Sequence, residues 1–217
     1  PLELASPSEV ASLASGLESD GGVDVLVHNA GFGVFGSIEE VDGATVERQF
    51  AVNLFGPLDL TRRLLPGLRA RHGLVVWIGS LAGRIALPFQ GHYSATKAAI
   101  ASISDAMRME LAPHGVRVTC IEPADFSTGF TDGRIVTRAS ASPYADALER
   151  CLAAVQEQEH GAPGPARVGR VVDGLSRLRR PPARRSVGQL ARTMCTLLRL
   201  LPDRVREATV RARYRLS

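Results

Sequence analysis

Lysine is almost absent from this 217-residue chain, because 25 of its 26 basic residues are arginine and only Lys97 is lysine. Its three cysteines, Cys120, Cys151 and Cys195, are too far apart for a disulfide framework or a CxxC metal pair. We therefore expect a reduced, cytoplasmic compartment and no bound metal. No apolar run approaches the roughly 20 residues of a membrane span. With 45% hydrophobic and 22% charged residues, the composition is that of a globular protein.

The basic residues are unevenly distributed. Residues 1–159 carry 12 basic and 19 acidic side chains, a balance of −7, whereas residues 160–217 carry 14 arginines and 3 acids, a balance of +11. Such an end can bind RNA or a membrane surface, but it contains one aromatic residue, Tyr214, and so lacks a base-stacking platform. We interpret 160–217 as an Arg-rich helical region of the same domain, with solvated arginines and no nucleic-acid partner.

Short β-branched runs alternate with helical patterns along the chain. Ser6, Pro7 and Glu9 are typical of a helix start with a capping box, and Gly21 ends that helix. Strands are predicted at 23–28, 74–78, 116–121 and 185–187, and further helices at 43–71, 92–112, 143–159, 166–179 and toward the C-terminus. Strands joined by helices form parallel crossovers. The prediction is one α/β domain over 1–217, a doubly wound, Rossmann-like parallel sheet in three α/β/α layers.

The segment from Gly31 to Gly36 fits G-x-G-x-x-G and follows a predicted strand. As a dinucleotide fingerprint it would cradle a pyrophosphate at a helix N-terminus. The next predicted strand should then end in an acidic residue, but it runs into Gly79 and Ser80. We favour a strand-end turn in which glycine permits close approach of a ligand or strand.

Four polar residues indicate the chemistry. Tyr93 and the single lysine, Lys97, lie one turn apart on a predicted helix, where an ammonium would lower the pKa of the phenol and make it an acid/base catalyst. Ser80 follows a predicted parallel strand, at the end of the sheet where α/β sites form, and Asn53 lies within the preceding helix. Each residue alone is ordinary in a helix or loop, but the combination points to a site.

These residues resemble the short-chain dehydrogenase/reductase family over essentially the whole chain. Asn53, Ser80, Tyr93 and Lys97 coincide with its Asn-Ser-Tyr-Lys tetrad, and residues 93–97 are its Y-x-x-x-K signature. Residues 28–31 are similar to its N-N-A-G motif with His28 first, and 123–128 to its P-G-x-x-x-T segment, with Ala124 for glycine. From Asp125 onward the chain looks most like the 17β-hydroxysteroid and retinol dehydrogenase branch.

The resemblance implies an NAD- or NADP-dependent oxidoreductase that interconverts an alcohol and a carbonyl on a small apolar substrate, such as a steroid or retinoid. Tyr93 would exchange the proton, Lys97 would lower its pKa and bind the nicotinamide ribose, Ser80 would polarise the substrate oxygen, and Asn53 would anchor a relay water. The implied cofactor contacts, besides Tyr93 and Lys97, are Glu3, Asn29, Ala30, Gly31, Pro123, Ala124 and Thr128. The family commonly forms homodimers or homotetramers through two helices, here 43–71 and 92–112.

One family feature is missing. The T-G-x-x-x-G-x-G phosphate loop lies far upstream of N-N-A-G in the family, and only 27 residues precede His28 here. We expect a domain that lacks its first βαβ unit, exposes apolar sheet edges and binds dinucleotide weakly by itself.

Two other interpretations remain open. One is a catalytically incompetent dehydrogenase fold that acts as an interaction or dimerisation module. The other is a serine hydrolase, although Ile78 breaks the G-x-S-x-G elbow at Ser80. Phe126, Phe130 and Tyr144 are candidates for the pocket or its lid, with core packing the alternative.

Overall fold

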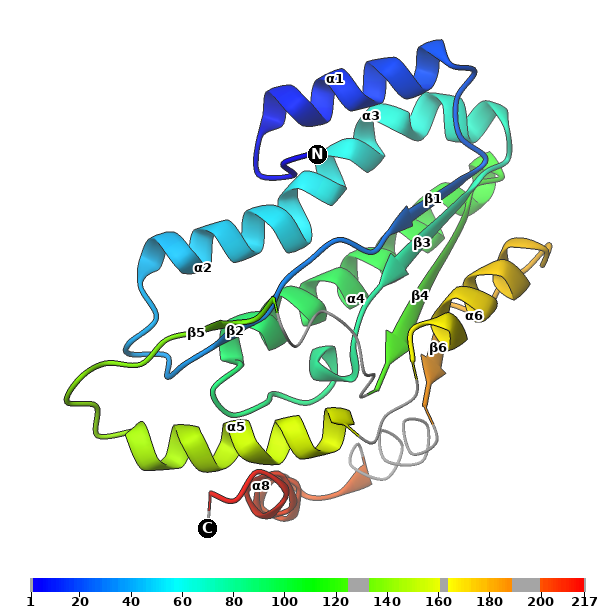
Figure 1. The fold of residues 1–217 in the computed structure, drawn as a ribbon. Coiled ribbons are helices and arrows are strands. Elements are labelled where there is room, and N and C mark those ends of the chain that lie inside the picture. Colours follow the sequence, from blue (N-terminus) through cyan, green and yellow to red (C-terminus); the bar gives the residue numbers. More distant parts are fainter. Residues whose placement is uncertain (1, 125–132, 161–163, 189–199, 217) are drawn as a thin grey trace.

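The computed structural model describes residues 2–124, 133–160, 164–188 and 200–216, and its centre is a four-stranded parallel sheet (Figure 1). The strand order is β1-β3-β4-β6, and every neighbouring pair is parallel. The bounds are β1 Val25–His28, β3 Leu74–Ile78, β4 Arg117–Pro123 and β6 Arg184–Val187. The predicted strands are confirmed to within a few residues, and the α/β class with its parallel sheet is confirmed.

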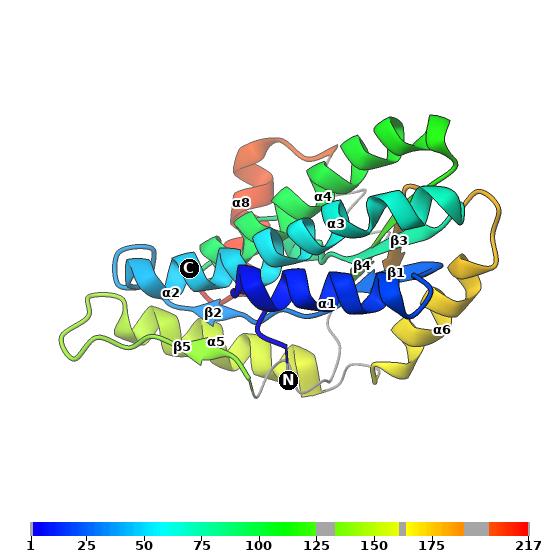
Figure 2. The same ribbon diagram turned by 90° about the horizontal axis from the view of Figure 1, so that it is seen from above.

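Helices cover both faces of this sheet (Figure 2). On one face lie α1 (Pro7–Ser19), α3 (Gly56–Ala70) and α4 (Gly91–Leu111); on the other lies α6 (Ala166–Ser176). Alternate strand residues divide between the faces, so Val75 and Trp77 pack toward α1, α3 and α4 while Leu74 and Val76 pack toward α6. The sheet is therefore the middle layer of three, as expected.

A second small sheet was not predicted. It pairs β2 (Val34–Phe35) with β5 (Ile135–Val136) in parallel. Phe35 is buried among residues of α5 (Ala145–His160), and Tyr214, just after α8 (Asp203–Arg213), packs into the same cluster. Two-residue strands carry no sequence periodicity, which explains why they were missed.

The helix expected at 43–71 is interrupted. It forms α2 (Gly43–Phe50), a π-helical turn η1 (Ala51–Phe55), and α3. A π-helical turn widens the helix by one residue and is frequent at functional sites. Asn53 lies within this turn.

The start of α1 differs from a full capping box. The Ser6 hydroxyl accepts a hydrogen bond from the Glu9 N–H at 3.4 Å, as predicted. However, the Glu9 carboxylate accepts from the Glu3 N–H at 2.9 Å, and the Ser6 N–H donates to the Glu3 carbonyl. The residues before α1 thus form a turn, and in the described residues Glu3 does not follow a strand.

The Gly31–Gly36 segment contains β2 and is not followed by a helix, since α2 begins at Gly43. The fingerprint interpretation is excluded here, and in place of the favoured turn the segment is extended and pairs with β5. At the edge of the main sheet, Val25 and Val27 of β1 are 38% and 39% exposed, as expected for an uncovered apolar edge. Among the described helices, none has the length and apolar character needed to cross a bilayer.

Candidate active site

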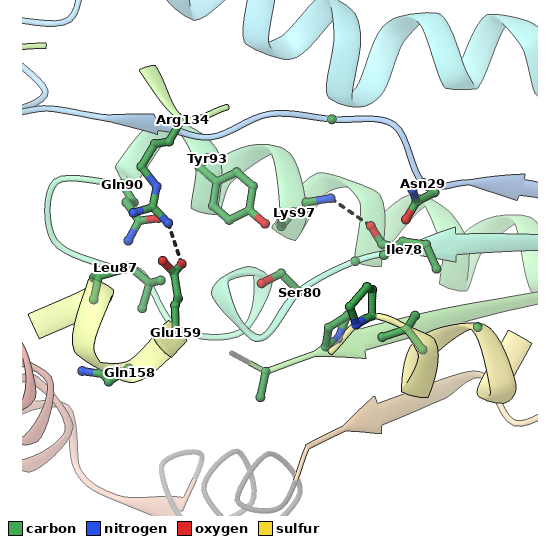
Figure 3. A pocket seen from close by; sticks show the side chains of 18 of the residues that line it. Asn29, Ile78, Ser80, Leu87, Gln90, Tyr93, Lys97, Arg134, Gln158 and Glu159 are labelled. Atoms are coloured by element: carbon green, nitrogen blue, oxygen red, sulfur yellow. Dashed lines mark hydrogen bonds and ion pairs between the residues drawn. The ribbon is translucent and has the colours of Figure 1, made fainter. Parts of the chain in front are cut away.

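A cavity of about 530 Å³ opens where β1, β3 and β4 end (Figure 3). Its lining includes Asn29 after β1, Ser80 after β3, and Pro123 and Ala124 at the end of β4. Because the strands are parallel, their carboxyl ends meet at one edge, where ligands bind in open α/β sheets. The cavity is therefore the candidate active site.

Tyr93 and Ser80 meet in this cavity. Tyr93 comes from the first turn of α4 and is buried, and its hydroxyl points toward Ser80 in Figure 3. Burial raises the pKa of Tyr93 to about 12, while a hydrogen bond with the Ser80 side chain acts in the opposite direction. Ser80 also caps a short 3-10 turn, η2 (Leu81–Gly83), by accepting from the Ala82 N–H at 3.1 Å. Tyr93 is thus a neutral phenol near pH 7.

Lys97 lies one turn further along α4. Its Nζ donates to the Ile78 carbonyl at 2.9 Å and lies 5.7 Å from the centre of the Tyr93 ring. Burial lowers the pKa of Lys97 to about 8. The expected lowering of the Tyr93 pKa by Lys97 is not observed in this structure: burial has the largest effect on this pKa, and the charges that act on it are those of Arg134 and Glu159.

Asn53 holds the loop after β1 and does not line the cavity. Its Oδ1 accepts from the Phe32 N–H at 3.0 Å, and its Nδ2 donates to the Phe32 carbonyl at 3.0 Å and to Thr96 Oγ1 at 3.3 Å. Thr96 Oγ1 in turn donates to the Tyr93 carbonyl at 2.8 Å. The π-helical turn therefore connects Asn53 to both the loop and α4.

The expected cofactor residues separate into three groups. Asn29, Gly31, Pro123 and Ala124 line the cavity with Tyr93 and Lys97. Ala30 is exposed beside them but is not part of the lining. Glu3 is placed elsewhere, where its carboxylate pairs with Arg48 at 3.4 Å.

Thr128, like Phe126 and Phe130, lies outside the described residues. Tyr144 is not among the residues lining the cavity, and its hydroxyl donates to Glu39 at 2.7 Å near the start of α5. The interpretation of Tyr144 as a pocket residue is therefore wrong.

His28, at the end of β1, has a structural role. Its Nε2 lies 2.6 Å from Thr61 Oγ1, and its ring lies 4.3 Å from that of Trp77. Burial lowers the pKa of His28 to about 4, so the imidazole is neutral near pH 7.

Four polar cavity residues were missed by sequence reasoning: Gln90, Arg134, Gln158 and Glu159. Arg134 directly precedes β5 and forms an ion pair of 2.6 Å with Glu159 near the end of α5. Two oppositely charged residues so far apart in sequence produce no periodic or motif signal, and only the fold brings them together.

Comparison with known proteins identifies the family. A family model described as short chain dehydrogenase matches residues 2–138. The chain belongs to this family. It is 32% identical over 202 residues to a 3-ketodihydrosphingosine reductase of Bacteroides thetaiotaomicron, which covers 91% of this chain and 75% of that protein.

Solved structures agree with this assignment. A short-chain dehydrogenase from Streptomyces avermitilis matches with a TM-score of 0.81 and 29% identity, over 95% of this chain and 75% of that one. A Burkholderia cenocepacia short-chain dehydrogenase, solved with NADP, matches with a TM-score of 0.65 and 23% identity, over 98% and 76%, which shows a shared fold. The chain spans half the length of some other curated relatives.

The chain is thus a short-chain dehydrogenase enzyme, an NAD(P)-dependent oxidoreductase of carbonyl groups. The relatives do not single out the 17β-hydroxysteroid and retinol branch.

The cavity residues fit one half of the nicotinamide dinucleotide. A Cβ on Gly31 would lie 3.0 Å from Asn53 Oδ1, so glycine at this position permits the close approach of the loop to Asn53. Lys97 has three N–H donors, and the described residues accept one of them. The remaining donors suit the hydroxyls of the nicotinamide ribose. In the described part of the chain, no glycine-rich loop leads directly into a helix N-terminus as a pyrophosphate cradle would.

Proposed function

We propose that this cavity interconverts a carbonyl and an alcohol on a small apolar substrate, of steroid, retinoid or similar size, with Tyr93 as the proton donor. The observation that carries the proposal is the hydrogen bond between the Tyr93 and Ser80 side chains inside the cavity, with Lys97 one turn away. NAD(P)H, when bound, supplies the hydride; the protein residues supply the proton and the orientation.

Ser80 and Tyr93 orient the carbonyl oxygen. The Ser80 hydroxyl already accepts from the Ala82 N–H, which fixes its lone pairs and leaves its own proton to be donated. A carbonyl oxygen placed between the two hydroxyls accepts from both, and the Tyr93 proton moves to it as negative charge develops. In the oxidation direction the same proton returns to Tyr93.

Lys97 acts on the phenolate that this transfer leaves. Before the transfer Tyr93 is neutral, as its raised pKa indicates, and a nearby cation stabilises it little. After the transfer the phenolate carries a negative charge in a buried place, where a cation stabilises it strongly. The Lys97 ammonium, held by the Ile78 carbonyl, stabilises that charge and keeps two donors for the cofactor ribose. Asn53 is a positioning residue, because it holds the Phe32 backbone beside the nicotinamide end.

Part of the cavity lining is apolar. Leu87 and Val155 contribute to it beside the polar groups, and apolar lining favours a substrate with a hydrocarbon part. The relative from Bacteroides thetaiotaomicron is named for the reduction of 3-ketodihydrosphingosine, which supports an apolar ketone here.

We also propose that the protein forms a homodimer or homotetramer through α3 and α4. Phe55, in the turn before α3, is 59% exposed, and Met109 of α4 is 72% exposed. Light scattering of the purified protein should give a mass of two or four chains, and Met109→Glu should lower it. A monomer would contradict this part of the proposal.

The activity is tested by following NADH and NADPH oxidation in the presence of long-chain ketones, on the protein as its gene encodes it. Ser80→Ala should lower kcat by about 100-fold, the typical effect of losing one donor to a developing oxyanion. Ser19→Ala is the control, because its hydroxyl is exposed on α1 and donates only to the Ser15 carbonyl. The absence of ketone-dependent oxidation, or full activity in Ser80→Ala, would overturn the proposal.

A further inference from the structure

The ion pair between Arg134 and Glu159 lies inside the cavity, at the end away from Lys97 (Figure 3). The side chains are 3% and 14% exposed, and Arg134 Nη2 lies 2.6 Å from Glu159 Oε1. In Figure 3 the side chains of Arg134 and Gln90 overlap at one end of the cavity, and Glu159 points toward the guanidinium from α5. A buried charge pair in a mostly apolar cavity is costly, so its location calls for a reason.

The Arg134 guanidinium has more N–H donors than its described neighbours offer acceptors. A guanidinium has five N–H groups, and the Glu159 carboxylate accepts from Nη2. Nε is buried without a hydrogen-bond partner, and the guanidinium carbon lies 5.8 Å above the centre of the Phe35 ring, a surface that attracts the charge without accepting a conventional hydrogen bond. Nε has almost no accessible surface, so the donors that a ligand could reach are the other N–H groups of the guanidinium, which lines the cavity.

The pair lines the same cavity as Tyr93, so one substrate molecule can contact both the guanidinium and the Tyr93 hydroxyl. The charges of Arg134 and Glu159 also act on Tyr93, where Arg134 lowers and Glu159 raises its pKa. Gln90, which is buried and lines the same end, adds a neutral amide.

We infer that Arg134 binds a second oxygen of the substrate, and that this oxygen is uncharged, as in a hydroxyl or a second carbonyl group. The inference rests on the proposed function, since it names the substrate class of that same cavity: an apolar ketone that carries another oxygen a few bonds from the reacting one. Glu159 decides the charge, because its carboxylate already neutralises Arg134 and would repel a carboxylate on the substrate.

The alternative is that the pair only ties the β5 segment to α5. A neighbouring pair does this on the surface, where Arg138 Nε lies 2.6 Å from Glu149 Oε1 and both side chains are about half exposed. Arg138 follows β5 and Glu149 belongs to α5, but neither lines the cavity. Arg138→Lys is therefore a matched control for effects on the connection itself.

The experiment compares three ten-carbon ketones with the reacting carbonyl at the same position: 3-decanone, 1-hydroxy-3-decanone and 3-oxodecanoate. Turnover is measured as kcat/KM with the preferred cofactor, on the protein as encoded. Binding is measured without cofactor, by saturation-transfer NMR of each ketone in competition with the others. The variants are Arg134→Lys, which keeps the charge but loses the planar fork, and Glu159→Gln, which removes the negative charge but keeps an acceptor.

The hydroxy ketone should be preferred over 3-decanone by about tenfold or more, as one hydrogen bond to a charged group predicts. Arg134→Lys should remove most of this preference, and Arg138→Lys should leave it unchanged. Glu159→Gln should raise the relative use of 3-oxodecanoate, because it leaves Arg134 unneutralised.

Equal binding of the hydroxy ketone and 3-decanone would overturn the inference, as would an unchanged preference in Arg134→Lys. The binding arm decides this without turnover. If the ketones bind but no cofactor is oxidised, the proposed function is contradicted. The binding preference then still tests the inference about the substrate class.

Discussion

Asn53 holds the backbone of Phe32 from both sides, accepting from its N–H and donating to its carbonyl, each at 3.0 Å. The amide is presented by the π-helical turn, and it fixes the loop that leads from β1 to the cavity. This relationship gives Asn53 a measurable contribution to stability, independent of any catalytic effect.

Asn53→Ala should lower the free energy of unfolding by about 2–3 kcal/mol, because the Phe32 N–H and Thr96 lose a buried partner while Gln49 still donates to the Phe32 carbonyl at 3.2 Å. Urea denaturation of the chain measures this. Asn29→Ala, at an exposed position nearby, should change stability by less than about 0.5 kcal/mol. Equal effects of the two substitutions would show that the Phe32 bonds are unimportant.

Glu122 is the second stability test. Its buried carboxylate lies 2.6 Å from Arg84 Nη2 and 3.2 Å from Arg184 Nη1, and so joins the segment after Ser80 to β6. Glu122→Ala removes a buried acceptor from two partly exposed arginines, of which Arg184 keeps its ion pair with Asp105, so we expect a loss of about 2–3 kcal/mol. Glu149→Ala, which breaks the exposed pair with Arg138, should cost less than about 1 kcal/mol. A small loss in Glu122→Ala would mean that water replaces the carboxylate.

Because His28 is buried as a neutral imidazole, the protein should lose stability in mild acid. Its pKa is about 4 in the folded protein and about 6.5 when unfolded, so the unfolded chain binds more protons between these values. The stability from the neutral imidazole is complete above pH 6.5 and is lost as the pH falls toward 4, on the order of 3 kcal/mol in total. Urea midpoints of wild type and His28→Asn should diverge over this window and run parallel above it. Parallel curves throughout would contradict the burial of a neutral histidine.

Because Lys97 is buried, the stability of the protein should also depend on pH in the alkaline range. Its pKa is about 8 when folded and 10.5 when unfolded, so the folded state again binds fewer protons between the two values and stability rises with pH. Relative to Lys97→Met, the wild type should gain on the order of 2–3 kcal/mol between pH 8 and 10.5. A constant difference between the two proteins would show that the ammonium is solvated.

The elements with strong patterns could be predicted from sequence. The apolar run 74–78 is β3, and the small-residue helix at 92–112 is α4, which places Tyr93 and Lys97 one turn apart. The pattern could not show the π-helical turn around Asn53, because helix propensities are the same on both sides of it.

The cavity wall formed by Arg134 and Glu159 depends on β5 and α5 folding back over the sheet, a long-range arrangement that leaves no local signal. The protonation states of Tyr93 and Lys97 could not be predicted from the sequence either. Burial has the largest effect on both pKa values, and burial is a property of the folded cavity.

The central claim is that Tyr93 donates the proton to the substrate, and Tyr93→Phe tests this claim most directly. The chain offers a matched control in Tyr144→Phe, which removes an exposed hydroxyl bonded to Glu39. With the protein as encoded, saturating cofactor and a long-chain ketone, Tyr93→Phe should lower kcat by at least about 100-fold, with a melting temperature close to that of the wild type. Tyr144→Phe should keep wild-type kcat. Retained turnover in folded Tyr93→Phe would contradict the assignment of Tyr93 as the proton donor.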